Sequence, residues 1–420
     1  MTRSTFALVL VLTLSGSAAK AQTVTNRGFV EGQVIGYPQK APNDTTRLIG
    51  DLLVRDDLFV RPAEWLQLAA GADLRVNSHD QVETKWRFDW EDRSIQRPRF
   101  SMRRLSATVH KGPLTLDVGK QFIRWARADV LNPTDRFAPK DYMTVVNTEV
   151  LPVLGVRPTL QFGSETFEAV WVAQPTPSRL PLLNQRWALL PPGAAGAALV
   201  DNGGLPRDRS QQGIRWRHMG ERFESALSFF DGVNHLPNFE TVITGVPVGA
   251  DGLLLPTRID VTRFYPKLRT YGVDFAIPTS MVNVKAEAAY FTSPEQINDE
   301  YVLYVVELER QSGNWLFDAG YAGEVVTEQR ELFPSNPERG LARSIVGRAA
   351  YTGDPRRSFA VEGAVRQDGG GVYMKGEFSE AIGGHWRVTA TGIGIGGHDD
   401  DFIGQFRRNS SATLGLRFSF

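Results

Sequence analysis

The sequence predicts an all-β protein: a transmembrane antiparallel β-barrel of about 18 strands, with about 16 as the alternative count, short periplasmic turns and long extracellular loops. Three observations lead to this fold class. Apolar and polar residues alternate with period two in many separate segments. The connections between these segments are alternately short and long. The polar face of the segments carries charged residues in mid-segment, which suits a water-filled interior.

The N-terminal residues 1–21 are typical of a secretory signal peptide. Arg3 precedes an apolar stretch at 6–14, and small residues lead to an Ala-x-Ala cleavage site that ends at Ala21. The stretch is too short to span a membrane, although an N-terminal anchor is the alternative interpretation. We therefore assign 1–21 to the signal peptide and 22–420 to the barrel. The chain has no cysteine, which excludes a lipid-modified cysteine and any disulfide.

The alternation is clearest in the last strand, where Leu414, Leu416, Phe418 and Phe420 share one face. Successive side chains of a strand point to opposite faces, so such a segment has one apolar and one polar side. The same pattern recurs throughout the chain. Strands are expected near 27–37, 48–60, 64–77, 99–111, 113–125, 154–163, 166–174, 211–219, 222–231, 267–277, 281–292, 299–311, 314–327, 340–352, 357–367, 370–381, 385–396 and 410–420.

The connections between the predicted strands fall into two length classes, which is the pattern of a barrel with tight turns at one end and long loops at the other. The short turns all carry Gly or Pro. They are expected at 61–65, 110–114, 162–166, 218–222, 277–281, 310–314, 352–357 and 382–386. The long connections are expected at 78–99, 126–153, 175–211, 232–266, 328–339 and 397–409.

A secreted β-sandwich is the main alternative, because it also shows period two. A sandwich has about seven to nine strands in its two sheets, far fewer than predicted here. In addition, the polar faces carry charges such as Lys285, Glu287, Asp318 and Glu362 in mid-strand. A closed soluble core would bury these charges at a cost of several kcal/mol each, whereas a wide wet lumen leaves them solvated. The charges therefore favour the membrane barrel.

A terminal strand that alternates and ends in Phe420 resembles the C-terminal signature of bacterial outer-membrane proteins. The matching residues are Leu414, Leu416, Phe418 and Phe420. The resemblance implies recognition by the outer-membrane assembly machinery through Phe420, and a location among outer-membrane lipid and lipopolysaccharide. We expect this strand to close the barrel against the first strand, near 29–35, because a ring of strands leaves no backbone group unpaired in hydrocarbon.

A second resemblance covers 118–157. The strand with Gly-Lys-Gln, a following Trp and a loop containing Asn-Pro-x-Asp is similar to uncharacterised porin-like proteins of the DUF1302 kind and to alginate-export-type barrels. Ala126 stands where that group usually has glycine after the Trp. The resemblance supports the barrel class and implies nothing specific about the transported solute. The matching positions are Gly119, Lys120, Gln121, Trp125, Asn132, Pro133 and Asp135.

The long connection at 126–153 is the candidate pore loop, since a loop of this length is uncommon without a function. We expect it to fold inward and narrow the pore, with opposed cations and carboxylates setting a transverse field that selects small polar solutes. The alternative is a loop that lies over the mouth with solvated charges. The predicted constriction and lumen residues are Arg104, Asp117, Gln121, Arg124, Arg127, Asp129, Asp135, Arg136, Lys140 and Asp141.

A second basic cluster occupies 87–104. It could form an anion-attracting vestibule, because arginine binds carboxylate and phosphate through two parallel hydrogen bonds. The favoured interpretation is a set of surface arginines paired with Glu91 and Asp92 or with lipopolysaccharide phosphates. Its members are Arg87, Arg93, Arg97, Arg99, Arg103 and Arg104.

The function predicted from these features is passive diffusion of small hydrophilic solutes across the outer membrane of a Gram-negative cell. A polysaccharide export or surface-assembly barrel is one alternative. A barrel enzyme is a weaker one, since GxSxG, HExxH and P-loop motifs are absent from the sequence. We expect no cofactor, no metal and no catalytic residue. The 47 basic and 47 acidic residues balance, so nucleic acid is not an expected partner.

Overall fold

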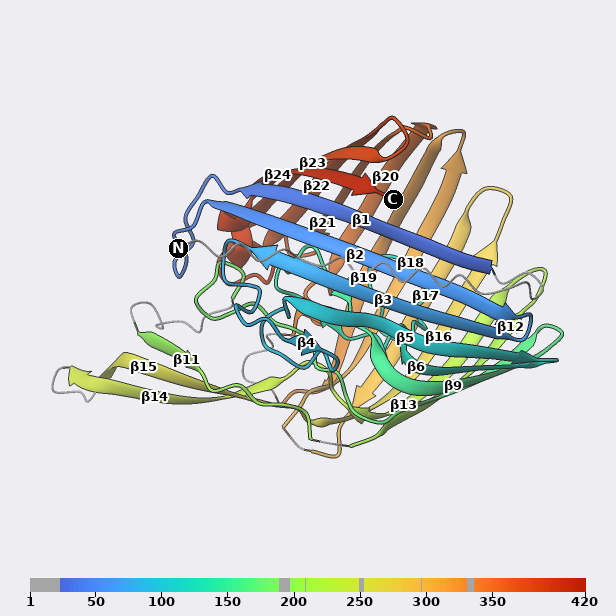
Figure 1. The fold of residues 1–420 in the computed structure, drawn as a ribbon. Coiled ribbons are helices and arrows are strands. Elements are labelled where there is room, and N and C mark those ends of the chain that lie inside the picture. The colour runs from blue at the N-terminus through green and yellow to red at the C-terminus, as the bar shows by residue number, and fades with distance from the viewer. Residues whose placement is uncertain (1–22, 189–196, 208, 249–252, 296, 331–335) are drawn as a thin grey trace, which may run out of the picture.

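The computed structural model describes residues 23–188, 197–207, 209–248, 253–295, 297–330 and 336–420. The predicted signal peptide lies outside these residues. The described chain forms a closed barrel of 18 antiparallel strands with the longer connections gathered at one end, as Figure 1 shows. No helix among the described residues is long and apolar enough to cross a membrane. The predicted fold class is confirmed, with 18 rather than 16 strands.

The 18 barrel strands lie in chain order around the ring, each hydrogen-bonded to the next. They are β1 (Thr23–Gly36), β2 (Leu48–Ala63), β3 (Leu66–Asn77), β5 (Phe100–Lys111), β6 (Leu114–Gln121), β9 (Val153–Phe162), β10 (Glu165–Val172), β12 (Gln211–Met219), β13 (Glu224–Val233), β16 (Lys267–Pro278), β17 (Asn283–Thr292), β18 (Glu300–Ser312), β19 (Trp315–Glu328), β20 (Ser344–Asp354), β21 (Arg357–Arg366), β22 (Gly371–Ile382), β23 (Trp386–Gly397) and β24 (Ser411–Ser419).

Smaller elements lie in the connections. Two of them, β4 and β11, pair in parallel with a neighbour, and the two 3-10 helices η1 and η2 lie in the loops before β20 and β24. They are β4 (Phe88–Asp89), β7 (Lys140–Asp141), β8 (Glu149–Val150), β11 (Ala198–Asp201), β14 (Asn238–Val248), β15 (Leu253–Phe264), η1 (Pro337–Arg339) and η2 (Gly404–Asn409).

Alternation along the strands places apolar side chains on the outside of the barrel and polar ones inside. In β16, Tyr271 and Val273 are exposed on the outer face, whereas Asp274 is buried on the inner face opposite Glu287 of β17. On β24, Leu414 and Leu416 are exposed in the same way. An apolar exterior is what acyl chains require, while the strand-to-strand hydrogen bonds satisfy the backbone.

The barrel closes between the first and last strands, as the terminal alternation predicts. Phe29 pairs with Ser419 and Ile35 pairs with Thr413. Beyond the ladder, the backbone N–H of Phe420 donates to the Gly28 carbonyl oxygen at 3.0 Å, and the Gly28 N–H donates to the Phe420 oxygen at 3.2 Å. The terminal residue therefore takes part in the closing seam.

Two segments differ from the predicted strands. The strand expected at 113–125 ends at Gln121, because the chain turns off the wall and buries Ile123 and Trp125 among apolar side chains in the lumen. Gly119, at φ +118°, lies just before this departure, in a region that residues with a side chain rarely adopt. The connection expected at 232–266 contains the β14–β15 hairpin, which projects beyond the barrel on the side of the long loops (Figure 1).

The largest apolar core lies inside the barrel rather than between two layers. Ile123, Trp125 and Phe137 from the segment after β6 pack against Phe230 and Phe291 of the inner wall. The Trp125 and Phe137 rings meet edge to face at 5.1 Å, and so do Phe137 and Phe230. This core holds the segment 122–152 against the wall, and the candidate site is built on it.

Candidate functional site in the barrel lumen

The segment 122–152 is fastened to the inner wall by carboxylates of β17 and β18. Glu287, only 2% exposed, accepts hydrogen bonds from the backbone N–H groups of Arg127 at 2.8 Å, Ala128 at 3.0 Å and Thr134 at 2.9 Å, and from the Thr134 hydroxyl at 2.8 Å. Glu307 accepts in the same way from the N–H groups of residues 129 and 130. Two mid-strand acids thus bind the loop through its backbone. We name this segment the inward loop.

Side chains of the inward loop add ion pairs to the same wall. The Arg127 guanidinium donates to Asp274 at 2.8 Å and to Glu224 at 2.6 Å. The Asp129 carboxylate accepts from the Lys285 ammonium at 2.8 Å, and Lys285 also donates to Glu309 at 2.7 Å. Both predicted lumen residues therefore connect the loop to strands β13–β18.

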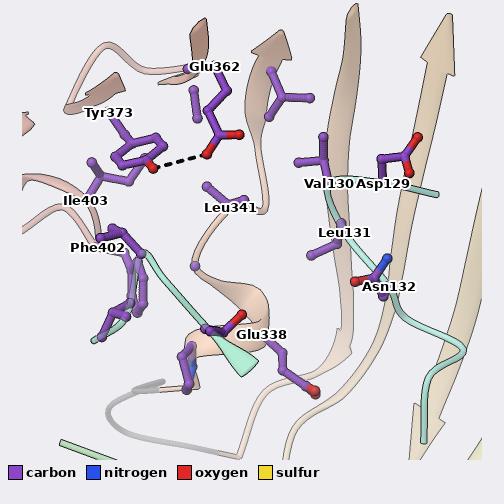
Figure 2. A pocket seen from close by; sticks show the side chains of 18 of the residues that line it. Asp129, Val130, Leu131, Asn132, Glu338, Leu341, Glu362, Tyr373, Phe402 and Ile403 are labelled. Carbon is purple, nitrogen blue, oxygen red and sulfur yellow. Dashed lines mark hydrogen bonds between the residues drawn. The ribbon is translucent and has the colours of Figure 1, made fainter. Parts of the chain in front are cut away.

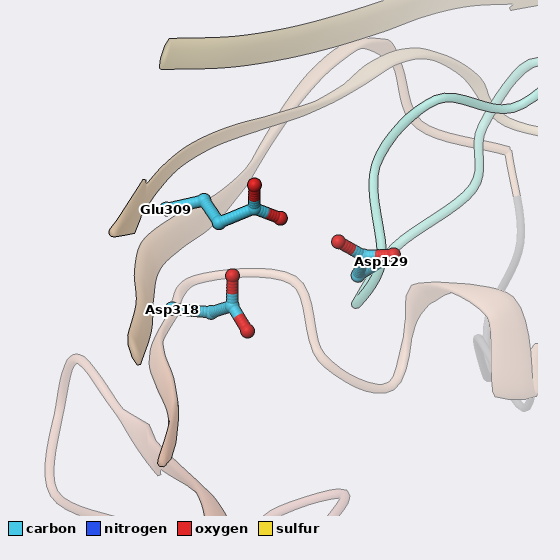
Figure 3. Close-up of side chains that lie close together, drawn as sticks. All are labelled: Asp129, Glu309 and Asp318. Atoms are coloured by element: carbon cyan, nitrogen blue, oxygen red, sulfur yellow. The ribbon is translucent and has the colours of Figure 1, made fainter. Parts of the chain in front are cut away.

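Three carboxylates come together beside this contact, those of Asp129, Glu309 and Asp318, as Figure 3 shows. One oxygen atom from each lies within 4.8 Å of the others. Because the Lys285 ammonium contacts two of the three, the protein itself supplies a cation here. We interpret the group as part of the charged lumen wall.

Two other predicted residues, Arg124 and Asp135, form hydrogen bonds within the inward loop. Asp135, 1% exposed, accepts from the Arg124 guanidinium at 3.1 Å and from the backbone N–H groups of Trp125 at 2.5 Å and Ala126 at 2.7 Å. These bonds close the turn at the Asn-Pro-x-Asp segment. Asp135 therefore shapes the loop, whereas the Arg124 side chain remains half exposed.

Arg136 and Lys140 lie deeper, beside the η1 helix. Arg136 donates to Glu338 at 2.9 Å, and His235 contacts the other Glu338 oxygen at 2.8 Å. Burial acts to raise the pKa of Glu338, but the charges of Arg136 and His235 outweigh it and hold that pKa well below its usual range. Burial also lowers the pKa of Lys140, in spite of the nearby Glu338 and Asp135.

Asp141 belongs to a buried network that ties several loops together. Arg97 donates to both of its oxygens, at 2.8 and 2.9 Å, and Arg179 reaches it at 3.4 Å. Arg179 also binds Asp92, which pairs with Lys120 at 2.7 Å. Burial acts to raise the pKa of Asp141, but the Arg97 charge holds it well below its usual range. Asp92 thus pairs with Lys120 and Arg179 rather than with the arginines of the 87–104 cluster proposed from the sequence.

The opposite side of the lumen carries a row of arginines on β2, β3 and β5, which we call the arginine wall: Arg55, Arg75, Arg103 and Arg104. On β5, Gly71 faces Arg104 and Ala72 faces Met102, so Arg103 is the extra residue of a β-bulge. The bulge turns two consecutive arginines inward. Both guanidinium groups lie over the Phe122 ring, at 4.7 and 5.3 Å from its centroid.

The remaining predicted residues lie on the neighbouring strand β6. Asp117 accepts from Arg157 of β9 at 2.8 Å and from Thr108 of β5 at 2.5 Å. Gln121, at the end of β6, donates to the Gly155 carbonyl oxygen at 3.1 Å. Asp117 therefore contributes to a neutral cross-strand pair, and Gln121 fixes the point where the inward loop leaves the wall.

A cavity of about 420 Å³ lies between the inward loop and the inner wall of β18–β23 (Figure 2). Val130, Leu341 and Phe402 are among its apolar lining residues. Charged groups line it as well, including Glu362, which accepts a hydrogen bond from the Tyr373 hydroxyl at 3.2 Å. The cavity offers a solute both apolar and charged surface inside the barrel.

Sequence reasoning did not single out Arg55, Arg75 or Glu149. The alternation of the strands at 48–60 and 64–77 could have placed both arginines on the polar face. Arg55 is in phase with Asp51 and Asp57, and Arg75 is in phase with Asp73 and Asn77. For Glu149 no local signal exists, since its partners lie on strands that precede it by more than 70 residues.

The barrel and its inward loop define the class of protein to which this chain is similar: outer-membrane porins of known structure. A BenF-like porin from Pseudomonas fluorescens Pf-5 aligns over 95% of this chain and 98% of its own, with a TM-score of 0.53 and 8% identity. Acinetobacter baumannii OccAB4 aligns over 95% and 98%, with a TM-score of 0.54 and 10% identity. Pseudomonas aeruginosa OpdQ aligns over 96% and 99%, with a TM-score of 0.54 and 10% identity.

These structures share the fold at very low sequence identity. No protein-family model matches the chain, and no curated protein matches it by sequence. The similarity to porin structures supports the coarser part of the resemblance seen in the sequence, an outer-membrane porin-like barrel. The finer resemblance to the DUF1302 kind stays a prediction.

Proposed function

We propose that this chain is an outer-membrane porin through which small hydrophilic solutes diffuse passively. The observation that carries the proposal is a closed 18-stranded barrel with an apolar exterior and a charged lumen crossed by one inward loop. The porin structures with the same fold over nearly the whole chain support it. In this proposal the protein is a channel and not an enzyme.

The physical reason for a membrane location is that the apolar exterior of the barrel suits lipid and its charged interior suits water. Hydrocarbon offers no hydrogen-bond partners, so a membrane strand must be paired on both sides, and the β1–β24 seam provides the last pairing. The location that follows is the cell outer membrane. We further propose that Phe420, at this seam, is recognised by the outer-membrane assembly machinery, and that the exterior is surrounded by lipid and lipopolysaccharide.

We propose that the inward loop is the constriction. It reaches the Lys285 side of the lumen through Asp129 and the arginine wall through Glu149, so it crosses the pore from one side to the other. The two sides differ in charge, which creates a transverse field across the passage. The lumen contains carboxylates as well as arginines, which favours a porin over an export barrel with a strongly positive lumen.

The test is single-channel recording of the refolded protein in a planar bilayer, with reversal potentials measured in a salt gradient. Resolved conductance steps are the expected result. If the folded barrel shows no conductance, even after the inward loop is shortened, the porin proposal is wrong.

A further inference from the structure

The most unusual contact of the arginine wall is with the inward loop itself. One carboxylate oxygen of Glu149 accepts from the Arg55 guanidinium and the other accepts from the Arg75 guanidinium, the latter at 2.5 Å. A single carboxylate thus bridges two cations of adjacent strands. Charge-assisted bonds of this kind are about twice as strong as neutral ones.

The same two arginines also share a fixed partner, Asp73. Arg55 donates to both Asp73 oxygens, at 2.8 and 2.7 Å, and Arg75 contacts one of them at 3.3 Å. Asp73 is a buried residue of β3 between them. Asp73 is paired directly with Arg55 in the β2–β3 ladder and with Ser101 in the β3–β5 ladder, so the barrel wall fixes its position.

Glu149 differs from Asp73 in access and in anchoring. Its side chain is 37% exposed, whereas those of Arg55 and Arg75 are 13% and 14% exposed. It lies on the two-residue strand β8, whose one ladder among the described residues is with β7, and it follows the exposed residues Asn147 and Thr148. The contact of Glu149 with Arg55 and Arg75 therefore lies at the surface of the lumen. Strand β8 can move away from the wall without disrupting the hydrogen bonds of any barrel strand.

The local charges show what Glu149 does. Arg55 and Arg75 carry two positive charges, and Asp73 and Glu149 carry two negative ones. Without Glu149 the site would hold one uncompensated positive charge, shared by two guanidinium groups that point to the same place. Such an arrangement binds a planar anion through both of its oxygens.

We propose that Glu149 is an internal competitor that occupies an anion-binding site formed by Arg55 and Arg75, and that an anionic solute must displace it to use the arginine wall. This inference rests on the proposed porin function. It predicts that an anion binds Arg55 and Arg75 only by competing with the Glu149 carboxylate. The passage of uncharged solutes should not depend on Glu149.

The experiment compares the full-length wild type with E149Q in planar bilayers, with acetate as the probe anion. In E149Q we expect the chloride-to-potassium permeability ratio to rise about threefold, and the acetate concentration that halves the chloride current to fall about tenfold, because removing a competitor frees the site. E377Q is the matched control. Glu377 is a half-buried acid of the β22 inner face, and the Lys375 ammonium lies 3.8 Å from its carboxylate.

Equal changes in E149Q and E377Q would overturn the inference, because they would show only the loss of one lumen charge. A second variant, E149D, retains the charge but shortens the reach, so its half-blocking acetate concentration should fall about threefold; an unchanged value would also contradict the proposal. A wild type without channels refutes the porin function itself, whereas channels that respond equally to both substitutions refute only the role of Glu149. Heat-modifiable migration in gels shows that each variant has folded.

Discussion

The charged side chains on the two sides of the lumen are compensated in different ways. On the β19–β22 side, charges of opposite sign are direct neighbours across the strands: Asp318 pairs with Arg348, Arg348 with Glu362, and Glu362 with Lys375. On the arginine wall, four cations are concentrated on β2, β3 and β5, and a carboxylate from the inward loop neutralises part of them. The four residues of the first side alternate in charge within the sheet. The four arginines of the second side have two carboxylates of their own sheet, Asp57 and Asp73, and take a third, Glu149, from the inward loop.

This difference has a functional consequence. A cross-strand row of alternating charges keeps its balance whatever the loop does, because its partners are fixed by the strand register. The arginine wall changes its charge when Glu149 leaves. In our proposal the inward loop sets the electrostatic state of the pore, and the contacts of Glu287 and Glu307 hold the loop in place.

The largest structural change is expected from Glu287→Ala. The substitution leaves three loop N–H groups and one hydroxyl without their acceptor, and each unsatisfied buried group costs about 1–3 kcal/mol. We expect the loop to detach and the single-channel conductance to rise about twofold, with larger current noise. Glu287→Gln, which keeps one acceptor oxygen, should show a smaller rise; an unchanged conductance in Glu287→Ala would show that the loop does not limit the pore.

The next effect is expected from replacing both Arg55 and Arg75 by glutamine. Since the site loses two cations and retains Asp73 and Glu149, we expect the chloride-to-potassium permeability ratio to fall about threefold. The reversal potential in a potassium chloride gradient measures it. Arg387→Gln is the matched control, because Arg387 is a lumen residue that donates to Ser379 and lies outside the arginine wall. If the permeability ratio changed by the same amount per removed charge in the double variant and in Arg387→Gln, the arginine wall would not differ from the rest of the lumen.

A smaller effect is expected from Asp318→Asn on the opposite side. The neighbouring Arg348 then loses one of its two acidic neighbours but keeps Glu362, so we expect the permeability ratio to rise only about 1.5-fold. The same reversal-potential measurement applies. If Asp318→Asn changed the permeability ratio as much as E149Q does, the charges of the β19–β22 side would be no better balanced than those of the arginine wall.

The smallest effect concerns pH. Burial acts to raise the pKa of Glu149, but the charges of Arg75 and Arg55 lower it from the ordinary 4.5 to about 2. A lowered pKa in the folded state means that the docked loop is stabilised above about pH 4.5 and loses this stabilisation as the pH falls towards 2. The contribution of Glu149 to ion selectivity should therefore stay constant between pH 8 and 5. A difference between wild type and E149Q that disappears with a midpoint near 4.5 would contradict the ion pairs.

The strands of this protein could be predicted from the sequence because period two is a local property. All 18 predicted strands correspond to barrel strands, including the closure of the last strand on the first. The β14–β15 hairpin was not predicted, because its residues do not alternate strictly: Val242 and Ile243 are adjacent and both exposed, and β15 begins with three leucines. The end of β6 was misplaced because Phe122 to Trp125 continue the apolar character of the strand while packing inside the lumen.

The candidate site could be predicted only in part. The length and charge of the 126–153 connection identified the inward loop, and Asp129, Arg127 and Arg104 lie in the lumen. For Asp135, Arg136 and Asp141, the residue type could not show whether the side chain faces the passage or stabilises the loop. In the structure all three are buried and form ion pairs within or between loops. Their part in the constriction stays a proposal.

By itself the sequence determined which residues face outward and which face inward, since alternation needs only the geometry of a single strand. Only the tertiary structure decided which inward charges meet: Glu149 reaches Arg55 and Arg75, and Glu287 reaches the backbone of residues 127–134. The physical reason is that these contacts join segments far apart in the chain, brought together by the closure of the ring and the apolar packing that holds the loop inside it.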